Sequence, residues 1–109
     1  MDAREERLAR NEVLFREVNQ TIESVADAQE PDAHVFEFVC ECPNIDCRLT
    51  LPLTLEVYED TRGAPDLFLV APGHDRPEIE DVVREGEGFQ VVRKRGEAAA
   101  IAERADPRA

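Results

Sequence analysis

Apolar residues recur along the first part of the chain in alternating steps of three and four, the spacing of one face of an α-helix. This face consists of Leu8, Asn11, Phe15, Val18, Ile22 and Val25. Residues 3–29 contain neither Gly nor Pro. Pro31 stops the pattern because the residue before a proline avoids the helical region. The pattern therefore predicts an amphipathic helix over residues 3–29.

The apolar face of this helix has two interpretations. We expect it to pack on the sheet of the same domain, with a charged face turned to solvent. The charged face consists of Arg4, Glu6, Arg10, Arg16, Glu17 and Glu23. The spacing also fits about three heptads, with Asn11 on the seam where coiled coils use a polar residue to fix register. A dimer through this helix is the alternative to a monomer.

Alternation with a period of two predicts a hairpin after the helix. The first strand spans residues 34–40 and turns Phe36 and Phe38 toward the core. Residues 48–51 alternate again after a turn. We expect Pro52 to end this second strand, because proline cannot donate to a strand ladder.

The second half of the chain predicts four further elements. A short helix spans residues 54–62, whose first residue, a threonine, suits an N-cap. Residues 66–71 form an apolar run typical of a buried strand. Residues 79–84 suit a helix face or a strand, and we prefer a hairpin with residues 89–93 because a glycine-rich turn separates the two. Residues 97–105 are rich in Ala and predict a short helix with little to bury.

Three cysteines gather at the tip of the first predicted hairpin. Cys40, Cys42 and Cys47 form a C-x-C-x4-C pattern, and the rest of the chain has no cysteine. An odd, clustered count is a poor disulfide framework. Three thiolates at a turn are pre-positioned for a metal that prefers soft ligands, so we predict a structural zinc site. Ligand type alone does not separate zinc from iron.

The fourth ligand of such a site has two histidine candidates. His34 lies six residues before Cys40, about 20 Å away along an extended strand, which is too far to share the metal. His74 follows a predicted strand and a Pro-Gly turn that redirects the chain. We therefore predict a Zn²⁺ ion held by Cys40, Cys42, Cys47 and His74. The remaining options for the fourth position are Asp46, Asp75 or a water.

Composition and charge limit the size of the core and the classes of partner that the protein can bind. The chain has 109 residues, 42% hydrophobic and 6% aromatic with no Trp, so one thin aliphatic core gains from a metal. Lys and Arg number 13 against 25 Asp and Glu, and the net charge of −12 excludes nucleic acid and anionic membranes as partners. The charged N-terminus lacks the apolar stretch of a secretory signal, and we expect a cytoplasmic protein.

A catalytic zinc is less favoured. It needs an open position for water and a general base, and Glu41 lies between two of the predicted ligands. Side chains alternate along a strand, so we expect Glu41 to point away from the thiols. The H-E-x-x-H, deaminase, phosphate-loop and G-x-S-x-G motifs are absent, and we expect no enzyme.

Several segments together resemble a family of small uncharacterised bacterial proteins. The segments are residues 10–19, residues 38–42 with Cys47, residues 53–58, residues 70–74 and residues 91–94. The resemblance covers nearly the whole chain and implies one coherent domain. It adds weight to His74 as the fourth ligand and implies no activity.

The elements together predict an α+β fold in which a long N-terminal helix packs on one antiparallel sheet of about four or five strands. A zinc knuckle closes the hairpin tip. Residues 1–31 form the helix, residues 32–96 the zinc-stabilised α+β part, and residues 97–109 a short helix with a frayed tail. We predict a small acidic zinc-binding protein that acts as a protein-interaction or regulatory module with a basic partner. The alternatives are a thiol-based redox or metal sensor and, less favoured, a zinc-dependent hydrolase.

Overall fold

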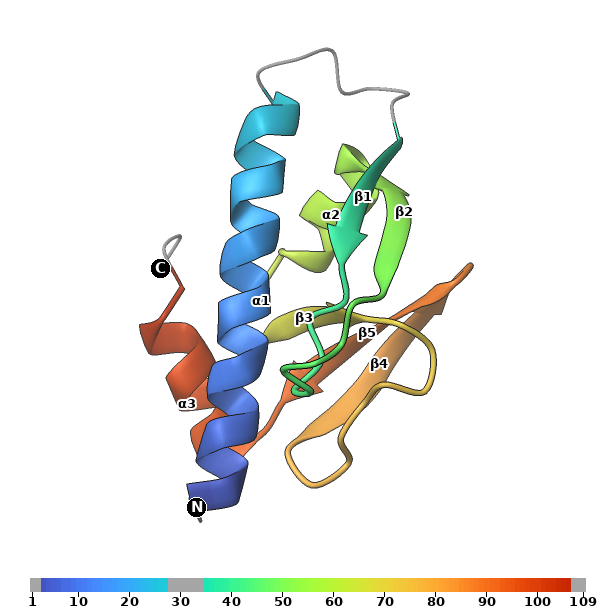
Figure 1. The fold of residues 1–109 in the computed structure, drawn as a ribbon. Coiled ribbons are helices and arrows are strands. Elements are labelled where there is room, and N and C mark those ends of the chain that lie inside the picture. Colours follow the sequence, from blue (N-terminus) through green and yellow to red (C-terminus); the bar gives the residue numbers. More distant parts are fainter. Residues whose placement is uncertain (1–2, 28–34, 107–109) are drawn as a thin grey trace.

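The computed structural model describes residues 3–27 and 35–106 and shows an α+β fold, as predicted (Figure 1). The helices are α1 (Ala3–Asp27), α2 (Leu55–Thr61) and α3 (Gly96–Arg104). The strands are β1 (Val35–Val39), β2 (Thr50–Thr54), β3 (Leu67–Val70), β4 (Glu80–Gly86) and β5 (Phe89–Lys94). None of the helices in these two ranges combines the length and apolar character that crossing a membrane requires.

The strands form two antiparallel sheets where we expected one. β1 pairs with β2, and the order of the second sheet is β3-β5-β4. The chain leaves the strand conformation after Val39 to form the cysteine turn, so β1 never lines up along β3. One backbone hydrogen bond, from the Glu41 N–H to the Leu69 carbonyl at 2.7 Å, joins the two sheets at this point.

One strand boundary differs from the sequence-based expectation, and one open choice between helix and strand is decided. Pro52 does not end β2 but lies within it, opposite Glu37. The sheet has only two strands, so β2 has a free edge where a missing N–H costs no ladder bond. The prediction for residues 79–84 is confirmed as a strand, since β4 pairs with β5 through a bulge between Val82 and Arg84.

The core lies between α1, α2 and the inner faces of both sheets. Phe38 stacks on Tyr58 of α2 with ring centroids 4.4 Å apart. The predicted N-cap of α2 is confirmed, because the Thr54 hydroxyl accepts a hydrogen bond from the Val57 N–H at 3.3 Å. The expectation that the C-terminal helix has little to bury was wrong: Ala98, Ile101 and Ala102 of α3 are buried.

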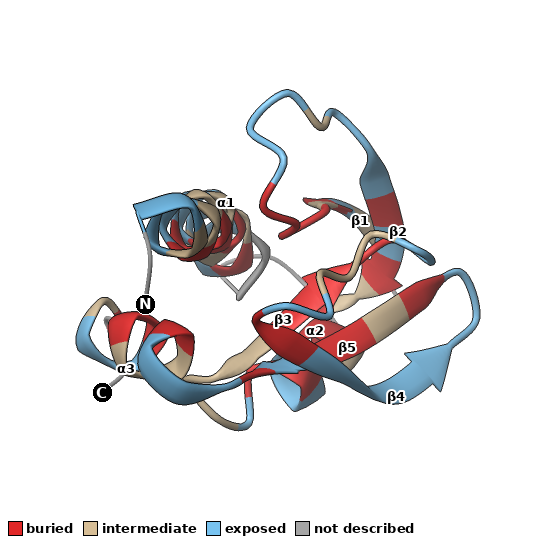
Figure 2. Ribbon diagram, turned by 90° about the horizontal axis from the view of Figure 1, so that it is seen from below, coloured by how far each residue is buried: buried red, intermediate tan, exposed pale blue. Residues whose placement is uncertain are grey.

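The buried face of α1 is not the face that the apolar spacing predicts. Val18 and Val25 of the predicted face are exposed, and the other members are only half-buried. Figure 2 shows that α1 carries buried, intermediate and exposed positions. The side chains that α1 buries are Ala9, Glu12, Val13, Arg16, Asn19 and Glu23. Arg16 and Glu23 were expected on the solvent face. The buried face of α1 carries polar side chains, and these contact polar groups on other elements of the fold. Much of the predicted apolar face stays at the surface instead.

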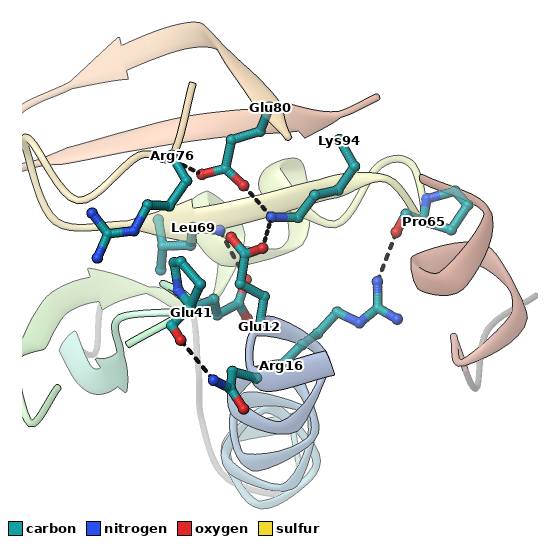
Figure 3. Close-up of polar contacts among 10 residues, drawn as sticks. Glu12, Arg16, Glu41, Pro65, Leu69, Arg76, Glu80 and Lys94 are labelled. Atoms are coloured by element: carbon teal, nitrogen blue, oxygen red, sulfur yellow. Dashed lines mark hydrogen bonds and ion pairs between the residues drawn. The ribbon is translucent and has the colours of Figure 1, made fainter. Parts of the chain in front are cut away.

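Buried charges of α1 are paired with groups from the far end of the chain. The Lys94 ammonium contacts the carboxylates of both Glu12 and Glu80 (Figure 3). Burial raises the pKa of Glu12 well above its usual value, opposed by Lys94 and reinforced by Glu80. The Arg16 guanidinium donates to the Pro65 carbonyl at 2.6 Å (Figure 3). It also lies 4.6 Å from the centroid of the Phe68 ring. These contacts hold α1 against the second sheet.

Candidate metal centre

Four side chains from two distant segments converge beside the first hairpin. The thiol sulfurs of Cys40, Cys42 and Cys47 and a ring nitrogen of His74 all lie within 4.8 Å of one another. Cys40 and Cys42 are buried, whereas Cys47 and His74 are half-buried. All three cysteines are free thiols. The structure therefore brings together the four residues that the sequence singles out.

The spacing of these donors fits a tetrahedral ion. Zn–S bonds of about 2.3 Å and Zn–N bonds of about 2.0–2.1 Å place sulfur and nitrogen ligands about 3.6 Å apart. The Cys40 Sγ lies 3.6 Å from the His74 Nδ1, and the Cys47 Sγ lies 3.8 Å from the same atom. Three thiols and one imidazole arranged in this way can hold a metal ion.

A tight turn presents Cys47 to the other thiols. The Cys47 N–H donates to the Asn44 carbonyl at 2.9 Å, and the Asn44 Oδ1 accepts from the Asp46 N–H at 3.0 Å. This is the local side-chain bonding that makes Asn a turn former. The Asn11 amide of α1 donates to the Pro43 carbonyl at 2.8 Å. Asn11 therefore anchors the cysteine turn to α1.

The end of β3 carries His74 to the thiols. The Ala71 N–H donates to the Cys40 Sγ at 3.1 Å, which fixes the chain leaving β3 against the first cysteine. The His74 N–H donates to the Ala71 carbonyl at 3.0 Å and closes a turn. Gly73 within that turn has φ +82°, a left-handed conformation that suits glycine. The Pro-Gly-His sequence thus redirects the chain as expected.

Hydrogen bonding divides the protons unequally between the two buried thiols. The bond from Cys40 lowers the pKa of Cys42 to about 5 against the opposing effect of burial, with His74 helping to lower it. The pKa of Cys40 is raised by that same bond and by burial. Thiolates are the form that ligates metals, so a bound cation would draw the remaining protons off this cluster.

Glu41 does not belong to the donor cluster, as its alternation along the chain predicts. Its fully buried carboxylate accepts hydrogen bonds from the Asn19 amide at 2.9 Å and from the Tyr58 hydroxyl at 2.8 Å. It also accepts the Leu69 N–H at 2.8 Å (Figure 3). Burial raises the pKa of Glu41, and these three bonds oppose that rise. A carboxylate used in this way is a structural anchor.

The other predicted ligand candidates stay outside the cluster. Asp46 is exposed and Asp75 is half-buried, and neither joins the donor group found within residues 3–27 and 35–106. His34 lies outside the described residues. His74 is therefore the fourth donor that the fold supplies.

Asn19 is the supporting residue that the sequence analysis missed. Its amide donates to the Val39 carbonyl and accepts from the Val39 N–H, both at 2.8 Å, as a neighbouring strand would. The same nitrogen donates to Glu41. An Asn inside a long helix is a poor helix former, and this was the available signal that the position has a tertiary partner.

Comparisons of the chain with protein-family models, with curated proteins and with solved structures found no match. The resemblance to a family of small bacterial proteins therefore stays a prediction. What the molecule does has to be inferred from the donor cluster and its surroundings.

Proposed function

We propose that Cys40, Cys42, Cys47 and His74 hold one structural Zn²⁺ ion and that the domain acts as a protein-interaction or regulatory module. The observation that carries the proposal is the convergence of four soft donors within 4.8 Å in a chain with only three cysteines. Four protein ligands complete a tetrahedral zinc shell, which is the signature of structural sites. The ion links the cysteine turn to the loop after β3, and so joins the two sheets.

A hydrolytic role has little support. Catalytic zinc keeps one position for water, whereas this cluster offers four donors. Glu41, the carboxylate between two of the ligands in sequence, accepts hydrogen bonds from Asn19, Tyr58 and Leu69. If the ion is structural, the protein acts through its surface, by binding other molecules. A net charge of −12 favours protein partners of basic character.

We also propose that the protein is located in the reducing cytoplasm. Three thiols stay available to a metal only where the thiol pool keeps them reduced. The same thiols support a second candidate function, a redox or metal sensor, because Cys47 is the one cysteine that is not buried. A peroxide would take two electrons from two zinc thiolates and with two protons become two waters, leaving a disulfide and free Zn²⁺.

The experiment is the metal content per chain of protein purified without a His-tag. We expect one zinc in the wild type, loss of zinc in His74→Ala, and retention in Asp75→Ala, the neighbouring residue outside the cluster. Replacement by Co²⁺ should give the absorption of a tetrahedral thiolate site. Absence of metal, or zinc untouched by His74→Ala, would overturn the proposal. Zinc release by peroxide, with a reversible change of shape or oligomeric state, would favour the sensor.

A further inference from the structure

An apolar groove runs beside the metal centre, between α1 and the cysteine turn. Its volume is about 510 Å³. We call it the knuckle groove, and its main lining residues are Leu14, Val18, Val39, Ile45, Cys47 and Leu49. Cys47 belongs both to this groove and to the donor cluster. The groove wall is therefore built by the same turn that the metal organises.

The groove displays aliphatic side chains that the fold leaves uncovered. Leu14 and Val18 of α1 are 46% and 41% exposed, and Ile45 and Leu49 across the groove are 44% and 49% exposed. Single exposed aliphatic residues are ordinary, but a contiguous group of large ones marks an interaction site. These two α1 residues lie outside the face that packs against the core, because α1 buries Glu12, Arg16 and Asn19 instead.

The charge around the groove selects the partner. Three exposed carboxylates neighbour its lining residues in sequence: Glu17 beside Val18, Glu37 two residues before Val39, and Asp46 between Ile45 and Cys47. Arg48 also lines the groove, but its guanidinium donates to the carbonyls of Ile45 and Cys47 at 2.9 and 3.0 Å and braces the turn. Hydrogen bonds to carbonyls leave the positive charge of Arg48 in place, so the three neighbouring carboxylates outnumber one cation and the net charge beside the apolar floor is negative.

We propose that the knuckle groove binds a segment of another protein that carries bulky aliphatic side chains flanked by Lys or Arg. The aliphatic side chains fill the floor between Leu14 and Leu49, and the basic residues meet the three neighbouring carboxylates. A second copy of this chain is a poor occupant because it would bring a charge of −12 against −12. The inference rests on the proposed zinc site, since the ion holds the Ile45–Leu49 wall in place.

The test uses two synthetic amphipathic helical peptides with the same leucine pattern, one with Lys and one with Glu at the polar positions. We expect the Leu/Lys peptide to bind the zinc-loaded protein and to shift the amide resonances of Leu14, Ile45 and Leu49. Binding should persist at about 1 M salt, where exposed charges are screened within about 3 Å. The Leu/Glu peptide should bind at least about tenfold more weakly.

Leu49→Asp is the decisive variant, and Val83→Asp is its matched control. Val83 of β4 is 47% exposed, as Leu49 is 49% exposed, but it lies in the other sheet. Leu49→Asp adds negative charge, so simple attraction of a basic peptide would become stronger, whereas binding in the groove should weaken at least about tenfold. Val83→Asp should leave the affinity unchanged. Ile45→Asp repeats the test from the turn if Leu49→Asp does not fold.

Four results would overturn the inference: no binding of the Leu/Lys peptide to zinc-loaded protein, equal binding of both peptides, equal binding of the Leu/Lys peptide to the wild type and Leu49→Asp, or a wild-type dimer that Leu49→Asp dissociates. The last result would make a second copy the occupant. Zinc per chain, measured on each protein, separates this inference from the proposed function. If zinc-loaded protein does not bind the Leu/Lys peptide, the groove proposal fails and the zinc proposal stands. If protein purified without zinc binds the peptide, the zinc proposal fails, together with the role given to the ion in holding the groove wall, and the groove remains a binding site.

Discussion

Glu41 and Leu69 are joined by two hydrogen bonds in opposite directions. The Glu41 N–H donates to the Leu69 carbonyl at 2.7 Å, and the Leu69 N–H donates to the Glu41 Oε1 at 2.8 Å. The pair ties the C-x-C segment to β3, the strand that leads into the His74 loop. The distance between the thiols and the imidazole is therefore set by a carboxylate that contacts none of them, which is how supporting residues orient a metal site.

Replacing Glu41 tests this relationship. Glu41→Ala leaves the buried Leu69 N–H, Asn19 amide and Tyr58 hydroxyl without their acceptor, so we expect a loss of about 2–3 kcal/mol in the free energy of unfolding. Zinc affinity should fall about tenfold because the two halves of the site are less well aligned. Urea unfolding and competition with a chelator measure the two effects. Glu37→Ala, an exposed change on β1, should cost under about 0.5 kcal/mol; equal costs would contradict the anchoring role.

Asn19 should matter more than its place in a helix suggests. Asn19→Ala removes both bonds to the Val39 backbone and the bond to Glu41, and we expect a loss of about 2–3 kcal/mol in urea unfolding. Thr21→Ala is the comparison, because Thr21 is exposed and its hydroxyl bonds only within the helix, to the Glu17 carbonyl. A loss no larger than that of Thr21→Ala would show that α1 does not depend on this contact.

Glu12 should make stability depend on pH. Burial raises its pKa in the native state, so the native state keeps a proton that the unfolded chain releases above about pH 4.3. The stability from this group is fully present below that pH and is lost as the pH rises toward the raised pKa. Glu12→Gln removes this loss, so we expect its free energy of unfolding to rise relative to that of the wild type as the pH increases from about 5 to about 8.

The measurement for Glu12 is urea unfolding at both pH values. Glu17→Gln makes the same change of charge at an exposed position of α1 and should not alter the pH dependence. Protonation of the metal ligands changes the free energy of unfolding of the wild type, Glu12→Gln and Glu17→Gln equally. It therefore does not contribute to the differences between them. If the free energies of unfolding of Glu12→Gln and the wild type differ by the same amount at both pH values, Lys94 keeps Glu12 ionised and the prediction is wrong.

Removal of the metal should loosen one part of the molecule selectively. A chelator should lower the melting temperature by more than about 5 °C and speed amide hydrogen exchange in residues 40–49 and 71–74. The β3-β5-β4 sheet should keep most of its protection, because its ladders and the buried Phe68 and Val92 do not involve the donors. Unchanged exchange near Cys47, or equal loosening throughout, would contradict a local clamp.

Local spacing was enough to predict most of the elements and the donor set. A period near 3.6 predicts α1, alternation predicts β1, and Thr54 marks the start of α2 because these signals act over a few residues. The C-x-C-x4-C pattern and the Pro-Gly turn likewise indicated the four donors, since the thiols are neighbours in sequence and only His74 had to come from elsewhere. The structure adds that the four atoms do meet.

The tertiary structure alone decided which face of α1 is buried. Hydrophobic spacing assumes that charged side chains cost energy inside a protein, and that assumption fails where distant partners satisfy them. Arg16 donates to the carbonyls of Pro65 and Ala102, and these partners lie far along the chain. Because α1 buries this face, Leu14 stays at the surface, where it lines the knuckle groove. Contacts between residues distant in sequence leave no local pattern, so they emerge only when the chain is folded.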